Sequence, residues 1–132
     1  MLRPLVVALS LLLLSGCISD APDIEEVEYT QVTGAVTFKE ATLLPPNSRL
    51  KIAVLDAKER GAILMRNEFN VGKLPVPFFL SAPTEIVNED GDYAIWAAIE
   101  VNGKTLLQTQ APFTRVINND VFNAIIEVKP LK

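Results

Sequence analysis

Few residues of this chain are of types and spacings that could do chemistry. Its single cysteine, Cys17, follows Leu14-Ser15-Gly16, and the sequence contains no histidine. Histidine is the commonest general base near neutral pH and the commonest zinc ligand, so either kind of site would need other residues. A cysteine with no second cysteine or histidine to join it is available for covalent modification or stays a free thiol.

Carboxylates are the other candidates for chemistry. Glu89, Asp90 and Asp92 surround Gly91, and two carboxylates can in principle act as an acid and a base. Acidic residues beside a glycine are also typical of a solvated turn, and we favour that interpretation. The sequence therefore predicts a protein that is not an enzyme, with no catalytic residues, no metal site and no cofactor.

The residues before Cys17 explain the cysteine better than catalysis does. Arg3 is followed by an apolar run from Leu5 to Leu14 that only Ser10 interrupts. Ten helical residues span roughly 15 Å, about half of the hydrocarbon core of a bilayer, so the run is too short to cross it comfortably. A short basic start, an apolar stretch and small residues are typical of a secretion signal, here residues 1–16.

Leucine three positions before the cysteine, followed by two small residues, resembles the lipobox of bacterial lipoproteins. The resemblance implies that the Cys17 thiol receives a diacylglycerol. The alternative is an ordinary signal peptide whose cleavage leaves Cys17 free. Several acyl chains would make a practically permanent membrane anchor, whereas a single chain binds only reversibly. Because Ile18 rather than Asp follows the cysteine, we expect the periplasmic face of the outer membrane, with a Gram-negative source assumed.

Residues 17–28 are predicted to form a lipidated N-terminus and an acidic spacer. Asp20, Asp23, Glu25, Glu26 and Glu28 repel one another and the apolar content is low. Calcium binding is the alternative, but the spacing of an EF-hand loop is missing. Without residues 1–16, the chain has 11 basic and 16 acidic residues, a net charge of −5. This charge disfavours nucleic acid as a partner.

Residues 29–132 show period-two alternation of apolar and polar residues, which indicates half-buried strands. We predict an all-β domain, a single antiparallel β-sandwich of about seven short strands. The expected strands are 31–40, 49–56, 63–71, 76–80, 92–101, 105–110 and 122–128. In the third of these, Ile63, Met65, Phe69 and Val71 are in phase. Pro77 makes 76–80 an edge or bulged strand.

The connections agree with these strands. Asn102-Gly103 predicts a type I′ hairpin turn, which needs positive φ at both positions. Further breaks fall at residues 45–48 and 89–92, and residues 83–89 are long enough for one helical turn.

One strand carries an unusual outward face. If the odd-numbered residues from Tyr93 to Val101 face the core, then Ala94, Trp96 and Ala98 face outward. Leu55 stands at an outward position of another strand, where a polar residue would be routine. Exposed apolar patches mark partner sites, and tryptophan is enriched among the residues that dominate binding. We therefore predict a partner-binding site at Trp96, Ala94, Ala98 and Leu55, unless the long connection after Gln110 covers this face.

With these residues in view, the chain resembles the YbaY-like family of bacterial lipoproteins, which includes the YscW-type pilotins of type III secretion. The resemblance covers Val32 to Val128 and leaves out the charged residues 57–62 and the connection 81–90, where the chain departs from the family. It rests on Val32-x-Gly34-x-Val36, Leu44-Pro45-Pro46, Leu55-Asp56, Val76-Pro77-Phe78, Tyr93 to Ile99, Gly103 and Leu106.

The resemblance implies a β-sandwich behind a lipid anchor and a pilotin-like binding or chaperone module. Its partners would be the membrane, through the lipid, and a secretin or another envelope protein. The alternative is an envelope-maintenance or carbohydrate-binding lipoprotein without a secretion partner. Such a protein would use exposed aromatic residues such as Trp96 or Phe79 to stack on sugar rings.

Overall fold

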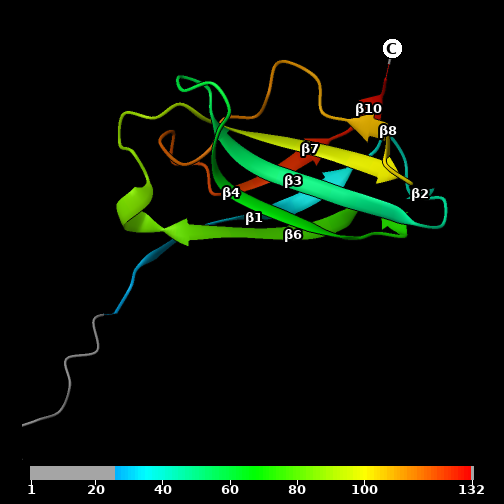
Figure 1. Cartoon of the computed structure of the whole chain (residues 1–132), viewed down its shortest axis with the longest axis horizontal. Helices are drawn as coiled ribbons and strands as arrows, with labels where there is room; N and C mark the ends of the chain where they lie inside the picture. The colour runs from blue at the N-terminus through cyan, green and yellow to red at the C-terminus, as the bar shows by residue number, and fades with distance from the viewer. Residues whose placement is uncertain (1–25, 132) are drawn as a thin grey trace, which may run out of the picture.

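Strand formation follows the alternation seen in the sequence. In the computed structural model, which describes residues 26–131, Val32 and Val36 of the first strand are fully buried, while Thr33 and Ala35 between them are partly exposed. The described residues form ten strands and one short 3-10 helix (Figure 1). They are β1 Tyr29–Thr37, β2 Thr42–Leu43, β3 Ser48–Asp56, β4 Ala62–Asn70, β5 Lys73–Leu74, β6 Val76–Pro83, η1 Thr84–Ile86, β7 Tyr93–Val101, β8 Lys104–Gln108, β9 Asn123–Glu127 and β10 Lys129–Pro130.

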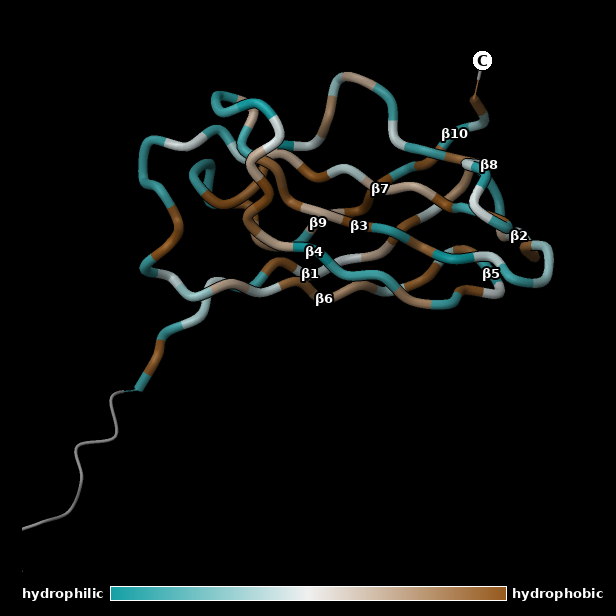
Figure 2. Tube along the Cα trace, in the orientation of Figure 1, coloured by the Kyte–Doolittle hydropathy of each residue, from teal (hydrophilic) through white to brown (hydrophobic). Residues whose placement is uncertain are grey.

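Two sheets make the layers of a β-sandwich. One has five strands in the order β10-β8-β7-β3-β4, and the other has three in the order β6-β1-β9. A two-stranded pair, β2 and β5, lies at one end of the molecule (Figure 2). The predicted sandwich is confirmed, and each of the seven expected strands corresponds to a longer strand. The strand that carries Pro77, β6, lies at a sheet edge as expected.

One strand pair differs from the expected antiparallel arrangement. β9 pairs with β1 in parallel, with Ala35 opposite Ile125. Parallel neighbours need a connection that crosses from one end of the sheet to the other. Residues 109–122 carry the chain from the five-stranded sheet to the three-stranded sheet, and β9 then starts at the same end as β1.

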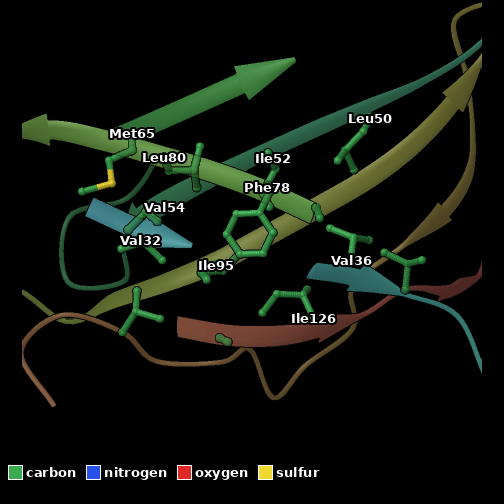
Figure 3. Packing of buried hydrophobic residues seen from close by; sticks show 14 of the residues in the cluster. Val32, Val36, Leu50, Ile52, Val54, Met65, Phe78, Leu80, Ile95 and Ile126 are labelled. Atoms are coloured by element: carbon green, nitrogen blue, oxygen red, sulfur yellow. The ribbon is translucent and has the colours of Figure 1, made fainter. Parts of the chain in front are cut away.

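The core lies between the two sheets. Figure 3 shows Leu50, Ile52 and Val54 of β3 packing toward the side chains of β1, β6 and β9. On β7, the residues predicted to face inward are buried at Tyr93, Ile95, Ala97 and Ile99, and Val101 is half-buried. In Figure 2, hydrophobic residues concentrate along the paired strands and hydrophilic ones in many of the connections. Among residues 26–131, no helix has the length and hydrophobicity to span a bilayer.

Gly34 and Gly103 both have positive φ values, and Gly34 also has no room for a side chain. Asn102 and Gly103 join β7 to β8 with φ values of 51° and 83°, which confirms the predicted type I′ turn. Gly34 of β1 has a φ of 154°, and a Cβ there would overlap the carbonyl oxygen of Ala124 on β9. The close approach of β1 and β9 therefore depends on the absence of a side chain at position 34.

Candidate binding face on the five-stranded sheet

The middle of the five-stranded sheet has an apolar outer surface. Antiparallel pairing of β3 with β7 sets Ala53 opposite Trp96 and Leu55 opposite Ala94. Side chains that lie opposite each other have Cβ atoms about 5 Å apart, so these four share one surface. The neighbours of Trp96 on this surface are small, and its indole stays half-buried rather than enclosed.

A β-bulge in β4 adds a further apolar side chain to this surface. The register of β3 and β4 shifts between Val54 and Leu55, so that Met65 lies opposite Val54 but Ile63 lies opposite Leu55. Leu64 is the extra residue that the bulge inserts. The prediction that Ile63 is in phase with Met65 was therefore wrong. Met65 is in the core, whereas Ile63 points to the outer surface and is 51% exposed.

The connection after Gln110 borders this surface instead of covering it. The backbone N–H of Ile95 donates to the carbonyl of Thr114, and that of Val116 donates to the carbonyl of Tyr93, each at 3.0 Å. The segment thus runs along the first half of β7, on the side where β8 pairs only with Ala98 to Val101, and places Phe113, 38% exposed, beside Ala94 and Trp96. We call the combined surface the Trp96 face; it consists of Ala53, Leu55, Ile63, Ala94, Trp96 and Phe113.

Two hollows lie on the Trp96 face, and Trp96 borders both. The first, about 240 Å³, lies between Leu55, Ala94, Phe113 and the β3–β4 hairpin. The second, about 470 Å³, lies between Ala53, Ile63 and outward polar residues of β3 and β4. Trp96 is therefore the residue that a ligand spanning both hollows would cross.

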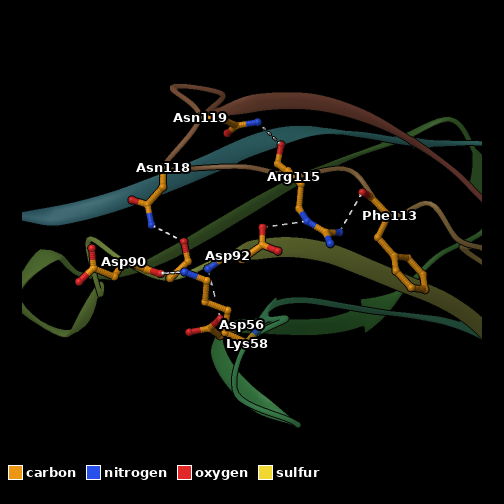
Figure 4. Close-up of polar contacts among 9 residues, drawn as sticks. Asp56, Lys58, Asp90, Asp92, Phe113, Arg115, Asn118 and Asn119 are labelled. Atoms are coloured by element: carbon orange, nitrogen blue, oxygen red, sulfur yellow. Dashed lines mark hydrogen bonds and ion pairs between the residues drawn. The ribbon is translucent and has the colours of Figure 1, made fainter.

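Ion pairs and hydrogen bonds surround the apolar centre. Arg115 donates to the Asp92 carboxylate at 2.9 Å and to the carbonyl of Phe113 at 3.3 Å, which holds the Phe113 segment against β7 (Figure 4). The buried carboxylate of Asp56 accepts the backbone N–H groups of Lys58 at 2.9 Å and Asp92 at 3.2 Å. These contacts tie the β3–β4 hairpin to the start of β7 and so fix the shape of the first hollow.

The second hollow has its own pairs. Lys51 lies 3.0 Å from Glu100, and the hydrogen bond and charge of Glu100 raise the pKa of Lys51. Arg49 lies 2.6 Å from Glu68, and its hydrogen bond lowers the pKa of that carboxyl. Both pairs are on the exposed side of the sheet, where such pairs contribute little to stability.

Ser48 and Lys51 have the Ser-x-x-Lys spacing of some acyl-transfer enzymes, a match that the sequence reasoning missed. Both residues lie on β3, where positions three apart face opposite sides of the sheet. The Ser48 hydroxyl is buried and donates to the carbonyl of Pro45 at 2.6 Å, while Lys51 pairs with Glu100. The two side chains do not form a nucleophile and base.

The acidic residues near Gly91 lie in a turn before β7. Asp92 pairs with Arg115, and the backbone carbonyl of Asp90 accepts a hydrogen bond from Lys58 Nζ at 2.7 Å. Within residues 26–131, no three His, Cys, Asp or Glu side chains are grouped to hold a metal ion.

The structure brings together three of the four predicted binding residues. Trp96, Ala94 and Leu55 line the first hollow. Ala98 is 0% exposed and offers no surface to a partner, so it does not belong to the face. Ile63 and Phe113 were not predicted, because the bulge and the return of the chain beside β7 leave no local pattern. Cys17 lies outside the described residues.

Comparison with known proteins adds a solved structure and a family. The chain is similar to an alternative pilotin from the type II secretion system of Vibrio cholerae, with 20% sequence identity and a TM-score of 0.71. The match covers 80% of this chain and 99% of that one, and it supports the sandwich fold. No curated protein sequence matched the chain.

The family assignment comes from residues 27–128, which include every strand of the two sheets except β10 and contain the whole Trp96 face. These residues match the family model described as the type III secretion system lipoprotein chaperone, YscW. The chain therefore belongs to the YscW family of type III secretion system lipoprotein chaperones.

Proposed function

We propose that this protein is a pilotin-like, non-enzymatic chaperone of the bacterial envelope that holds an apolar segment of a secretin or another envelope protein on its Trp96 face. The observation that carries the proposal is the apolar surface that exposed Ile63 and Phe113 form with half-buried Leu55 and Trp96, in a member of a lipoprotein chaperone family. Apolar surfaces of this kind mark partner sites, and tryptophan residues at their centre often dominate the binding energy.

Membrane attachment is the second part of the proposal. Cys17 receives lipid, residues 17–28 act as a spacer, and the β-sandwich works at the periplasmic face of the outer membrane. Each buried methylene of an acyl chain contributes about 0.8 kcal/mol, so several chains retain both the protein and its bound partner at the membrane. The lipoprotein description of the family supports this part.

Carbohydrate binding is the less favoured alternative. Phe79, 50% exposed, lies on β6 in the three-stranded sheet, whereas Trp96 lies on the outer surface of the other sheet. The two aromatic side chains are on opposite outer surfaces of the sandwich and cannot stack on the same sugar chain. A peptide segment uses the apolar neighbours of Trp96 as well as its ring.

Photo-crosslinking in cells tests the binding face. A photoreactive amino acid at Ile63 or Phe113 should capture a discrete envelope protein, and the same group at Phe79 serves as the control on the opposite surface. Trp96→Ala should remove the crosslinks from Ile63 and Phe113. Capture from Phe79 alone, or crosslinks that Trp96→Ala leaves unchanged, would contradict the proposal.

Metabolic labelling with a palmitate analogue tests the anchor. The wild-type protein should take up label, and Cys17→Ser should abolish it. Fractionation should place the wild type mainly with the outer membrane, and Ile18→Asp should move a measurable part to the inner membrane. Label that persists on Cys17→Ser would rule out the lipidation site.

A further inference from the structure

The Trp96 face has basic residues at both hollows. Arg60 and Arg115 border the first hollow, and Lys51 and Arg66 border the second. Along the strands, Leu55 and Ile63 lie between the hairpin that carries Arg60 and the position of Arg66, and Trp96 lies in the same cross-strand row as Arg66. A ligand that spans both hollows would therefore meet positive charge near each of its ends.

Only two of these basic side chains lack an acidic partner within residues 26–131. Arg115 is paired with Asp92 and Lys51 with Glu100, whereas Arg60 and Arg66 form no ion pair. Both arginine residues are exposed, one in the β3–β4 hairpin and one on β4. Each hollow thus has one arginine whose charge is not neutralised by an ion pair.

The acidic residues at the hollows do not cancel these charges. Asp56 accepts two backbone N–H groups, and Glu68 pairs with Arg49. The hydrogen bond of Arg49 is the largest cause of the lowered pKa of Glu68, and the charge of Arg66 acts on that carboxyl only as a smaller cause, without an ion pair. The chain as a whole is acidic, with a formal net charge of −4. Free positive charge at both ends of an apolar surface on an acidic protein is a specific attraction for carboxylates, because opposite potentials steer partners and fix their register.

We infer that the segment bound by the Trp96 face is an amphipathic peptide with apolar side chains at its centre and a carboxylate toward each end, which pair with Arg60 and Arg66. This inference rests on the proposed function and specifies the chemistry of its partner. The planar guanidinium group binds a carboxylate through two parallel hydrogen bonds, so the two arginine residues select for Asp or Glu and reject Lys or Arg.

A displayed library of random 16-residue peptides tests the inference. The full chain with a C-terminal affinity tag is captured in neutral detergent and used for selection as wild type and as the Arg60→Glu/Arg66→Glu double variant. Lys73→Glu/Lys104→Glu is the matched control. It makes the same change in net charge at exposed residues that border neither hollow.

The wild type and the lysine control should select peptides with apolar centres and an excess of Asp and Glu toward their ends. The Arg60→Glu/Arg66→Glu variant should select Lys and Arg there instead. It should bind the best wild-type peptide roughly tenfold more weakly or worse, and the loss should shrink at high salt. Thermal unfolding confirms that all variants fold.

The results separate the inference from the proposed function. Two results would overturn the inference and leave the binding face in place. The first is that the wild type selects apolar peptides without acidic ends, and the second is that the wild type and the Arg60→Glu/Arg66→Glu variant select the same peptides. If no peptides are selected, or if Trp96→Ala selects the wild-type peptides equally well, both fail.

Discussion

Leu55 of β3 and Ile63 of β4 lie opposite each other on the outer surface of the five-stranded sheet, although the alternation of β4 places Ile63 in phase with the buried Met65. One extra residue in β4 accounts for the difference, because each residue inserted into a strand reverses the side on which the following positions lie. The same bulge that turns Ile63 out widens the apolar surface from β7 across β3 to β4.

Substitutions at Ile63 and Met65 should therefore lower the free energy of unfolding by different amounts. Ile63→Ala should lower the free energy of unfolding by less than about 1 kcal/mol, since an exposed side chain loses few contacts. Met65→Ala should cost roughly 2–5 kcal/mol through loss of core packing. Urea denaturation of both variants measures the difference. A larger loss at Ile63 than at Met65 would argue against the bulge.

Trp96→Ala should reduce partner binding more than stability. The indole is half-buried, so we expect a loss of about 1–2 kcal/mol in folding free energy, below the 3–5 kcal/mol typical of a fully buried tryptophan. Affinity for a captured partner should fall by about 2 kcal/mol, roughly 30-fold in Kd. Urea titration and a binding isotherm measure the two quantities, with Phe79→Ala as the control. A stability loss above 4 kcal/mol with unchanged binding would place Trp96 in the core.

Gly34→Ala should destabilise the domain strongly, by roughly 3 kcal/mol or more, because the new methyl group would overlap the Ala124 carbonyl and force β1 and β9 apart. Gly103→Ala is the matched control. It has positive φ but no heavy atom within 4 Å of the added Cβ, so only backbone strain of about 1 kcal/mol is expected. Thermal or urea unfolding should show that Gly34→Ala is less stable than Gly103→Ala. The reverse order of stability would contradict the parallel pairing of β1 with β9.

The ion pair of Arg49 with Glu68 predicts a pH effect. Hydrogen bonding by Arg49 lowers the pKa of Glu68 in the folded protein. A carboxyl whose pKa is lower in the folded than in the unfolded state stabilises the fold above its unfolded pKa, and this contribution is lost as the pH falls through the folded pKa. An NMR titration should find Glu68 below the ordinary glutamate range, and Arg49→Gln should raise its pKa. If the pKa of Glu68 is the same in Arg49→Gln as in the wild type, Arg49 and Glu68 do not form an ion pair in solution.

Local chemistry alone determined much of this protein. Period-two alternation identified all seven longer strands, because successive side chains of a strand face opposite sides whatever the strand pairs with. Asn102-Gly103 specified its turn, since few other dipeptides adopt positive φ at both positions. The outward position of Trp96 followed from the same alternation within β7.

The relations between distant segments were decided only by the tertiary structure. The parallel pairing of β1 with β9, the bulge that exposes Ile63 and the return of Phe113 beside β7 all depend on which partner each strand finds. That choice is set by how the whole chain buries its apolar surface and satisfies its backbone hydrogen bonds, and no short stretch of sequence contains it. For the same reason Ala98 could be placed on the outer side of β7 from its position, but its complete burial depended on the residues packed around it.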